Sequence, residues 1–315
     1  MKTSVIIATY NGSKFIEEQF DSILAQSVQP DEVVITDDGS KDNTKEIVQK
    51  YIDEHGLNGA WHLYANEKNK GYAKNFLDGA MLTTGDIVFF CDQDDIWTPD
   101  RIKKMSEVMA ENSKINLLCS NLEPFYYEED TCRWSEKDLE VMKTDSSLEK
   151  CELTPMYFHL QRSGCTMCIR KTFLEEIMPY WTANWPHDDF VWKMAVVSSS
   201  CAILHFISMK RRMHSNNATV IRVRTRQWRI NQLHEYQIQY VHLNKYAQKC
   251  SASNKYLDII NKNIKSLKHR ISLVEHHNFF VWPVLAIKYK DCYPRIKGLY
   301  LDGYLSVMKE YKGIK

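Results

Sequence analysis

The sequence predicts an α/β protein built on a mostly parallel central sheet, followed by a C-terminal helical region. Short, continuously apolar segments alternate with segments whose apolar residues follow helical spacing, as βαβ units require. The apolar segments show no polar alternation, which is typical of strands buried on both faces. Several of them lead directly into polar residues, and ligands bind at the carboxyl ends of parallel strands.

The expected strands and helices alternate from the N-terminus onward. The strands are predicted, in chain order, in the segments "SVIIATYN", "DEVVITDDGS", "WHLYANEKNKG", "DIVFFCDQDD" and "INLLCS". Helical spacing between them predicts helices over Lys14–Ala25, Asp42–Tyr51, Lys74–Met81 and Arg101–Glu111. The polar cluster "SKDNT" supplies the start signal of the second of these helices.

The middle of the chain is less regular. Residues Glu123 to Leu153 are mixed and charged, and we interpret them as an insertion or flap. The segment "QRSGCTMCIRKTFL" predicts a strand that leads into a helix. The triplet "HDD" starts a further helix, and "CAILHFISMKRRMHSNN" predicts two more strand-like pieces.

The last part of the chain differs in charge and in pattern. Residues 221–315 carry 18 Lys and Arg against 6 Asp and Glu, a net charge of +12, whereas residues 1–220 carry −11. A helix with one apolar seam is predicted there by six residues spaced three and four apart: Leu257, Ile260, Ile264, Leu267, Ile271 and Val274. We therefore divide the chain into an α/β domain, 1–220, and a basic, mostly helical region, 221–315.

The composition excludes several classes of protein. Met1–Tyr10 lacks the apolar core of a secretory signal, and no apolar run reaches the ~20 residues of a membrane span. Nine scattered cysteines, an odd number, indicate a reducing compartment rather than a disulfide framework. Cys165 and Cys168 form a lone C-x-x-C without a second pair nearby, so we interpret them as strand residues rather than a zinc or redox site.

The acidic cluster "CDQDD" is the strongest chemical signal in the sequence. Asp92, Asp94 and Asp95 follow directly on an apolar segment. Carboxylates this close raise one another's pKa values unless a cation lies among them. Their hard oxygen atoms suit Mg²⁺ or Mn²⁺, which keep positions open for phosphate oxygens. Taken alone, however, the pattern is better explained by a solvated loop whose acids cap the next helix.

Further motifs favour a metal site over a solvated loop. The segments "SVIIATYNGSKFIEEQFDSILAQS", "DEVVITDDGSKDNT", "NKGYAKN" and "FFCDQDDIW" resemble, in this order, the inverting glycosyltransferases of family 2. The resemblance covers Met1 to about Asn112. It continues through "SGCTM", "HDD" and "RRMHSNN" to about Asn217, where it is similar to rhamnosyltransferases of bacterial surface-polysaccharide synthesis. It implies the GT-A fold, a nucleotide-sugar donor and a divalent cation, Mn²⁺ or Mg²⁺.

The resemblance also implies roles for individual residues. Asp38 would accept a hydrogen bond from the base, Asp92 would face the ribose, and Asp95 would position water or the donor sugar. Asp94, with Asp92 and the late residue His214, would bind the metal. The alternative for His214 is an ordinary surface histidine, but the polar segment "RRMHSNN" directly after an apolar strand favours the ligand. The remaining donor-site residues that the resemblance implies are Ala8, Thr9, Tyr10, Asn11, Asn69, Gly71, Lys74, Gly164, Cys165, Thr166 and Arg212. Arg211 could also meet phosphate charge, and Lys74 is also explained as a solvated helix residue.

The resemblance identifies Asp188 as the catalytic base and leaves Asp189 as the reserve candidate. Relatives often have an aromatic residue where Asp189 stands, which weakens the alignment at this point. Both acids are also explained as helix N-terminal carboxylates stabilised by the helix dipole. The dipole would depress the pKa of a base there, whereas burial among Trp185, Phe190 and Trp192 would raise it.

The sequence therefore predicts a metal-dependent hexosyl- or deoxyhexosyltransferase. It would move a sugar from a UDP- or dTDP-sugar to a hydroxyl of a glycan or lipid-linked glycan. A catalytically degenerate sugar-nucleotide-binding or scaffolding subunit is the non-enzyme alternative, but the metal acids and the base are retained. A nucleotidylyltransferase would need a glycine-rich loop after the first strand, and a dinucleotide oxidoreductase would need G-x-G-x-x-G there.

The basic region has three interpretations: packing, a homodimer seam, or contact with the inner face of an anionic membrane. Packing best explains the apolar seam. Clustered Lys and Arg favour anionic lipid, and the aromatic stretch "NFFVW" could enter the interface. Beyond charge, nothing supports nucleic-acid binding. We expect a cytoplasmic protein, peripheral on the membrane if the third interpretation holds.

Overall fold

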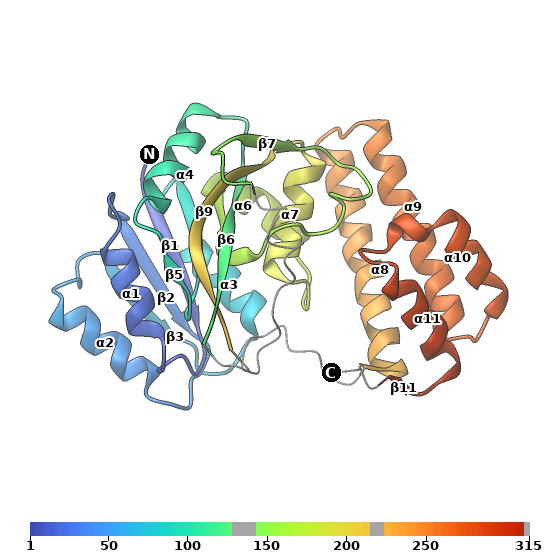
Figure 1. Ribbon diagram of the computed structural model, residues 1–315, viewed down its shortest axis with the longest axis horizontal. Helices are drawn as coiled ribbons and strands as arrows, with labels where there is room; N and C mark the ends of the chain where they lie inside the picture. The colour runs from blue at the N-terminus through green and yellow to red at the C-terminus, as the bar shows by residue number, and fades with distance from the viewer. Residues whose placement is uncertain (128–142, 215–223, 312–315) are drawn as a thin grey trace.

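The computed structural model describes residues 1–127, 143–214 and 224–311. Within these residues a nine-stranded mixed sheet forms the N-terminal body, and a group of helices packs beside it (Figure 1). The strand order is β3-β2-β1-β4-β8-β6-β9-β5, and β7 pairs with β9.

The first four apolar segments form the parallel half of the sheet, as predicted. They are β1 (Thr3–Thr9), β2 (Glu32–Asp37), β3 (Trp61–Ala65) and β4 (Ile87–Asp92). The helices between and after them are α1 (Ile16–Leu24), α2 (Thr44–Glu54), α3 (Tyr72–Leu82) and α4 (Arg101–Glu111). Val5 and Ile7 enter one hydrophobic core and Ile6 enters the other. Because both faces are covered, β1 is apolar at successive positions.

The second half of the sheet is mixed. β8 (Met167–Arg170) lies antiparallel between β4 and β6 (Leu117–Tyr126), and β9 (Cys201–Met213) runs parallel to β6. Two short strands, β5 (Ile96–Trp97) and β7 (Leu148–Cys151), pair antiparallel with β9. The helices of this half are η1 (Gly164–Thr166), α6 (Lys171–Ile177), η2 (Met178–Tyr180) and α7 (His187–Val197).

Three expectations for this half are corrected. The segment predicted as two pieces forms one strand, β9, because a register shift opposite Asn121 absorbs the irregularity without breaking the pairing with β6. Cys165 lies in η1, and only Cys168 is a strand residue. The expected insertion begins inside β6 and includes β7; its residues 128–142 lie outside the described part of the chain.

The C-terminal region is helical, as expected. It consists of α8 (Arg226–Lys249), α9 (Asn254–Val274), η3 (Phe279–Val281), α10 (Trp282–Lys288), η4 (Lys290–Cys292) and α11 (Lys297–Val307). A short antiparallel bridge joins β10 (Arg224–Thr225) to β11 (Glu310–Tyr311). The hydroxyls of Thr225 and Ser253 accept the N-terminal N–H groups of Trp228 in α8 and Tyr256 in α9.

The apolar seam of α9 packs inside the protein. Ile260, Leu267 and Val274 belong to the same hydrophobic core as Leu243 of α8 and Trp192 of α7. The helical region and the catalytic sheet therefore share one core. The proposed boundary between residues 220 and 221 lies outside the described residues. None of the helices in the described part of the chain combines the length and the apolar character that a membrane crossing requires.

A buried ion cluster ties three helices of this region together. Asp302 of α11 has no solvent exposure and accepts hydrogen bonds from Arg229 Nε at 2.6 Å and Arg270 Nε at 2.7 Å. The Tyr293 hydroxyl donates a third bond at 3.0 Å. Burial opposes ionisation of Asp302, but the charges of the two arginines outweigh it and hold its pKa below the usual value. The carboxylate is therefore fully paired.

Replacing this carboxylate should make the protein markedly less stable. We expect Asp302→Ala to lower the free energy of unfolding by about 3–5 kcal/mol, because two arginines are left buried without a counter-charge. Urea unfolding followed by circular dichroism measures the change. The control is Asp291→Ala, which removes the more exposed pair with Lys262 and should cost about 1 kcal/mol or less. Equal losses in the two variants would contradict this account.

Candidate functional site

The polar ends of β1, β2 and β4 meet at one edge of the sheet. Thr9 donates its hydroxyl to the Asp37 carboxylate at 2.9 Å, which ties the ends of β1 and β2 together. Gln93 bonds both backbone groups of Tyr10, through Oε1 at 2.9 Å and Nε2 at 3.2 Å. A Cβ on Gly12 would collide with the Gln93 amide. Sequence analysis missed Gln93, although its place inside the acidic cluster was a signal.

The four predicted residues of "ATYN" divide into structural and exposed groups. Ala8 is half-buried against the core, and the Thr9 hydroxyl is used by Asp37. Asn11 has a positive φ of 50°, and its backbone N–H and side-chain oxygen bond Ser40 and Lys41. Of the four, Tyr10 presents a large exposed ring, 45% accessible, at the edge where a base could stack.

Asp38 anchors the loop that precedes α3. Its Oδ1 accepts the Lys70 N–H at 2.8 Å, and its Oδ2 accepts the Gly71 N–H at 2.9 Å. The Asn66 amide also donates to Oδ1, and the Asn69 amide donates to the Asp38 carbonyl. Each carboxylate oxygen has two lone pairs, so Oδ2 retains capacity for one more donor. Gly71 has a φ of 84°, a conformation that favours glycine.

Lys74 lies apart from the acidic cluster. It points along the exposed face of α3, where its Nζ pairs with Asp78 at 2.7 Å and lies 5.9 Å from the Trp181 ring. This geometry agrees with the interpretation of Lys74 as a solvated helix residue.

The end of β9 binds the loop that carries the acidic cluster. His214 Nε2 lies 2.7 Å from Asp94 Oδ2, and both side chains are largely buried. The Arg212 N–H donates to Asp95 Oδ1 at 3.0 Å, and Arg212 Nε donates to the Asp94 carbonyl at 3.0 Å. The fold thus brings together residues that stand 120 positions apart.

The other acids of the cluster lie beside a thiol. Oxygens of Asp92 and Asp95 and the Cys165 sulfur all lie within 4.8 Å of one another. Burial, together with repulsion from Asp94, raises the pKa of Asp92 to about 6 and that of Asp95 well above its usual value. Burial also raises the pKa of the Cys165 thiol, which favours its protonated form. Within the described residues Asp95 Oδ2 is buried without a hydrogen-bond partner.

These residues fit a divalent cation. Two adjacent ligands of one octahedral ion, each about 2.1 Å from it, lie about 3 Å apart, close to the separation of Asp94 Oδ2 and His214 Nε2. Carboxylate oxygens suit Mn²⁺ or Mg²⁺. An imidazole nitrogen suits a transition metal such as Mn²⁺ better than Mg²⁺, and a protonated thiol suits neither. Within the described residues the unpartnered Oδ2 of Asp95 retains its capacity to accept a hydrogen bond or to ligate an ion.

The two arginines of β9 have different surroundings. The Arg212 guanidinium is committed to other groups: its Nε donates to the Asp94 carbonyl, it pairs with Glu18 at 2.6 Å, and it lies 4.4 Å from the Phe15 ring. Arg211 lies among the carboxylates of the cluster. Burial opposes its charge, but Cys165, Asp92 and the neighbouring acids raise its pKa. Of the two, Arg211 is the better partner for phosphate.

The two acids at the start of α7 also differ. Asp189 accepts the Trp185 indole N–H at 2.9 Å and pairs with the buried Lys193, so both of its oxygens are occupied. Asp188 accepts one backbone N–H with Oδ1. Its charge helps to raise the pKa of Asp92 and, after burial, that of Tyr72 to about 12, so Asp188 lies in the neighbourhood of both groups.

The η1 turn packs directly against the start of α7. A Cβ on Gly164 would lie 2.6 Å from His187 Nε2 and 3.1 Å from Asp188 Cβ. His187 cannot easily move, because it is buried and stacks on Phe76 with ring centroids 4.2 Å apart. The Thr166 hydroxyl is held by the Ser163 carbonyl at 2.7 Å. Gly164 therefore sets how closely η1 approaches the two α7 residues.

Arg101 is a second residue that sequence analysis missed. It is fully buried and donates to the Cys165 carbonyl at 2.6 Å, the Phe90 carbonyl at 3.4 Å and the Ser208 hydroxyl at 3.2 Å. It thereby connects β4, η1 and β9 beneath the site. Trp97 lies four positions earlier in the sequence, and its ring lies 4.1 Å from the guanidinium. An aromatic residue so close in the sequence was the one indication that Arg101 could be buried.

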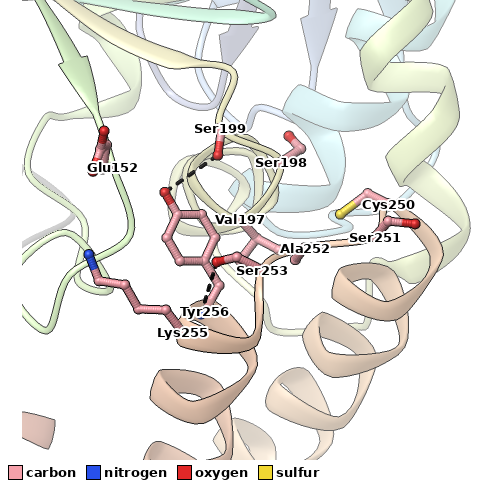
Figure 2. Close-up of a pocket in the computed structure, with 10 residues that line it drawn as sticks. All are labelled: Glu152, Val197, Ser198, Ser199, Cys250, Ser251, Ala252, Ser253, Lys255 and Tyr256. Atoms are coloured by element: carbon pink, nitrogen blue, oxygen red, sulfur yellow. Dashed lines mark hydrogen bonds between the residues drawn. The ribbon is translucent and has the colours of Figure 1, made fainter.

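A cavity of about 410 Å³ lies elsewhere, at the end of α7 opposite Asp188 (Figure 2). It is lined by that helix end and by the turn between α8 and α9. Ser199 and Tyr256 meet across it at 3.4 Å. The cavity contains none of the acids of the cluster, so we do not assign the site to it.

Comparisons with known proteins agree with this geometry. The family described as "Glycosyl transferase family 2" matches residues 4–177. The dTDP-rhamnosyl transferase RfbG of Shigella flexneri is 30% identical over 223 residues, covering 67% of this chain and 72% of RfbG. An uncharacterized glycosyltransferase of Nostoc is 25% identical over 190 residues, and the match spans 59% of this chain and 56% of that protein.

Two solved structures share the fold, which is the GT-A fold expected from the sequence. Staphylococcus aureus TarS in complex with UDP-GlcNAc has a TM-score of 0.60 at 19% identity, with 98% of this chain and 88% of TarS covered. The mannosyltransferase PcManGT of Pyrobaculum calidifontis, in complex with GDP-Man and Mn²⁺, has a TM-score of 0.58 at 17% identity, with 96% and 86% covered.

The close approach at Gly164 can be tested by stability alone. We expect Gly164→Ala to lower the free energy of unfolding by about 1–3 kcal/mol, because the new methyl group overlaps His187 and Asp188. Gly59→Ala is the control, since a methyl group there meets open space. It should be neutral or slightly stabilising. If Gly164→Ala unfolds no more easily than the control, the packing between η1 and α7 is wrong.

Proposed function

The chain belongs to glycosyl transferase family 2, and from this membership we propose that it transfers a sugar from a nucleotide-diphospho-sugar to a hydroxyl group with inversion at the anomeric carbon. One observation carries the proposal. Asp94 and His214 lie together as candidate cation ligands, and Asp188 of α7 packs against η1, the turn that carries Cys165 beside Asp92 and Asp95.

We propose that the nucleotide lies along the edge formed by β1, β2 and β4. The exposed Tyr10 ring would stack on the base, and the remaining capacity of Asp38 Oδ2 would accept a base N–H. Asp92 would face the ribose and share in metal binding. The cation at Asp94 and His214 would neutralise charge on the diphosphate leaving group. Arg211, rather than Arg212, would add positive charge there.

We propose Mn²⁺ or Mg²⁺ as the cation and a UDP- or dTDP-sugar as the donor. RfbG, a dTDP-rhamnosyl transferase, supports a dTDP-sugar, and TarS was solved with UDP-GlcNAc. PcManGT was solved with GDP-Man and Mn²⁺, which supports the metal and adds GDP-sugars to the candidates. The transferred group would be a hexosyl or deoxyhexosyl residue.

We assign Asp188 as the general base. The acceptor hydroxyl must lose a proton as its oxygen attacks the anomeric carbon, and a carboxylate on the side away from the leaving group can take it. Asp188 has an oxygen for which the structure gives no hydrogen bond within the described residues. Asp189 is committed to Trp185 and Lys193, which supports a positioning role for it.

The acceptor is proposed to be a glycan or a lipid-linked glycan of a bacterial surface polysaccharide. The similarity to RfbG and, over 35% of this chain, to the putative teichuronic acid glycosyltransferase TuaG of Bacillus subtilis supports this class. A lipid-linked acceptor would bring the cytoplasmic enzyme to the inner face of the membrane. The +12 charge of residues 221–315 supports that location.

Removing the proposed metal ligand should remove activity. We expect Asp94→Ala to abolish transfer and to weaken Mn²⁺-dependent binding of the nucleoside diphosphate, because the leaving group loses its counter-charge. Calorimetry of UDP or dTDP with and without Mn²⁺ measures binding, and a panel of donors and acceptors measures transfer. The exposed Asp78→Ala is the control. Full wild-type activity in a chelator would overturn the metal assignment.

The two α7 acids should respond differently. We expect Asp188→Asn to leave donor binding almost intact and to reduce transfer by ~10² or more, which is within the usual contribution of a general base. Asp189→Asn should mainly destabilise the fold, because it weakens the pairing of the buried Lys193. Donor calorimetry, initial rates and urea unfolding on both variants separate the roles. The opposite pattern would make Asp189 the base.

A further inference from the structure

We propose that one end of the helical region docks on an anionic lipid membrane. This end, which we call the tip, joins the start of α8, η3 and the end of α11. Its exposed apolar residues are Trp228, Phe279, Phe280, Val307 and Met308. The proposed function explains only why the protein would meet a membrane, and to that extent the proposal rests on it. The docking surface itself follows from the residues of the tip.

Hydrogen bonds hold the three segments of the tip together. Arg226 at the start of α8 donates to the carbonyls of Leu305 at 2.7 Å and Val307 at 2.8 Å, which are the last carbonyls of α11. The His277 Nδ1 atom, just before η3, lies 2.7 Å from the Ser306 carbonyl oxygen. The bridge between β10 and β11 adds a further link. The contacts between the three segments are thus made by polar groups, and the apolar side chains of the tip remain exposed on its surface.

The apolar residues of the tip form a patch rather than isolated exposures. Phe280 is 92% accessible and Val307 is 64% accessible, and their three partners are also exposed. Single exposed apolar residues are normal in globular proteins, but several gathered on one cross-linked end mark an interaction surface. Trp282 is not part of it. Its indole nitrogen is buried, and a Cβ on Gly303 would lie 2.7 Å from that atom. Of the aromatic stretch "NFFVW", Phe279 and Phe280 therefore belong to the tip and Trp282 does not.

The charges around the patch suit an anionic surface. Arg224 lies 5.9 Å from the Trp228 ring, and Arg226 and the exposed Lys309 stand beside the patch, against one acid, Glu310. Aromatic residues next to Arg and Lys are typical of interfacial anchors on anionic lipid. A second copy of this chain would bring the same positive charges face to face. Charge complementarity therefore favours lipid as the occupant.

Three of the basic residues of this region are not available for this contact. Arg229 and Arg270 are buried against Asp302, and Lys262 pairs with Asp291. The net charge near the patch is small, so the apolar side chains must supply most of the affinity. Binding should consequently be reversible, and salt should weaken it only in part.

The tip faces the same way as the catalytic edge. In Figure 1, β1 runs downward from the labelled N-terminus, so its carboxyl end points to the lower edge of the view, where β11 also lies. A protein docked through the tip would turn the acidic cluster toward the membrane. A lipid-linked acceptor hydroxyl could then reach Asp188 from the membrane side.

The test is co-sedimentation of the full chain with vesicles of phosphatidylcholine, with or without phosphatidylglycerol as the anionic lipid. We expect the wild type to bind the anionic vesicles at low salt. Phe280→Ser should weaken partitioning about tenfold, because a fully exposed aromatic ring loses its burial in the interface. Arg224→Glu should weaken binding to the anionic vesicles and leave the weak binding to neutral vesicles unchanged. Circular dichroism checks that each variant is folded.

Leu82→Ser is the matched control. Leu82 is an exposed apolar residue at the end of α3, on the amino side of the sheet, and its replacement should leave vesicle binding unchanged. Asp94→Ala should also bind vesicles like the wild type, so a failure of the proposed chemistry and a failure of docking are distinguishable. Docking is overturned if the wild type does not sediment or if Phe280→Ser binds like Leu82→Ser. Loss of a dimer in Phe280→Ser, seen by analytical ultracentrifugation without vesicle binding, would make the tip an interface between copies.

Discussion

The contact between the end of β9 and the loop after β4 is the constraint on which the site depends. Asp94 meets His214, and Asp95 receives the N–H of Arg212, so two segments 120 positions apart are held as one unit. Closing so long a loop is entropically costly, but the cost rises only slowly with length. Pairing within the sheet offsets most of this entropic cost, because β9 is already paired with β6 along its length. The contact between β9 and the loop after β4 holds the carboxylates in fixed positions although they repel one another. Ligands held in this way are what a cation site requires.

Buried arginines make this concentration of acids tolerable. Arg211 lies among the acids, and Arg101 lies beneath them with bonds to three chain segments. Burial lowers the pKa of Arg101, but acids and thiols nearby favour its charged form. The same solution recurs around Asp302, where the charges are reversed and two arginines surround one carboxylate. In both places buried charge persists because it is paired and hydrogen-bonded.

The helical region also supports the start of α7, which carries Asp188, the proposed general base. Tyr240 of α8 lies edge to face with Phe158, with ring centroids 5.0 Å apart, and Lys193 of α7 lies 5.5 Å from the same Phe158 ring. Lys193 pairs with the Asp189 carboxylate, and that carboxylate accepts a hydrogen bond from the Trp185 indole. The start of α7, and with it Asp188, is thus positioned from two sides: by η1 across Gly164 and by the shared core beneath. A close-packed interior transmits such positioning, because it leaves little room for rearrangement.

The sequence alone determined the α/β class, the order of the strands and helices from β1 to β4, and the edge at which polar residues gather. These follow from local periodicity and from the rule that parallel strands end on one side of a sheet. Only the tertiary structure showed how the hydrogen bonds and burial of Asp188 differ from those of Asp189, those of Arg211 from those of Arg212, and those of Trp282 from those of Phe280. Neighbours in a strand point to opposite faces, and neighbours in a helix point about 100° apart, so register and packing decide which of them meets the site. That choice depends on distant partners such as Glu18, Lys193 and Gly303, which no local pattern identifies.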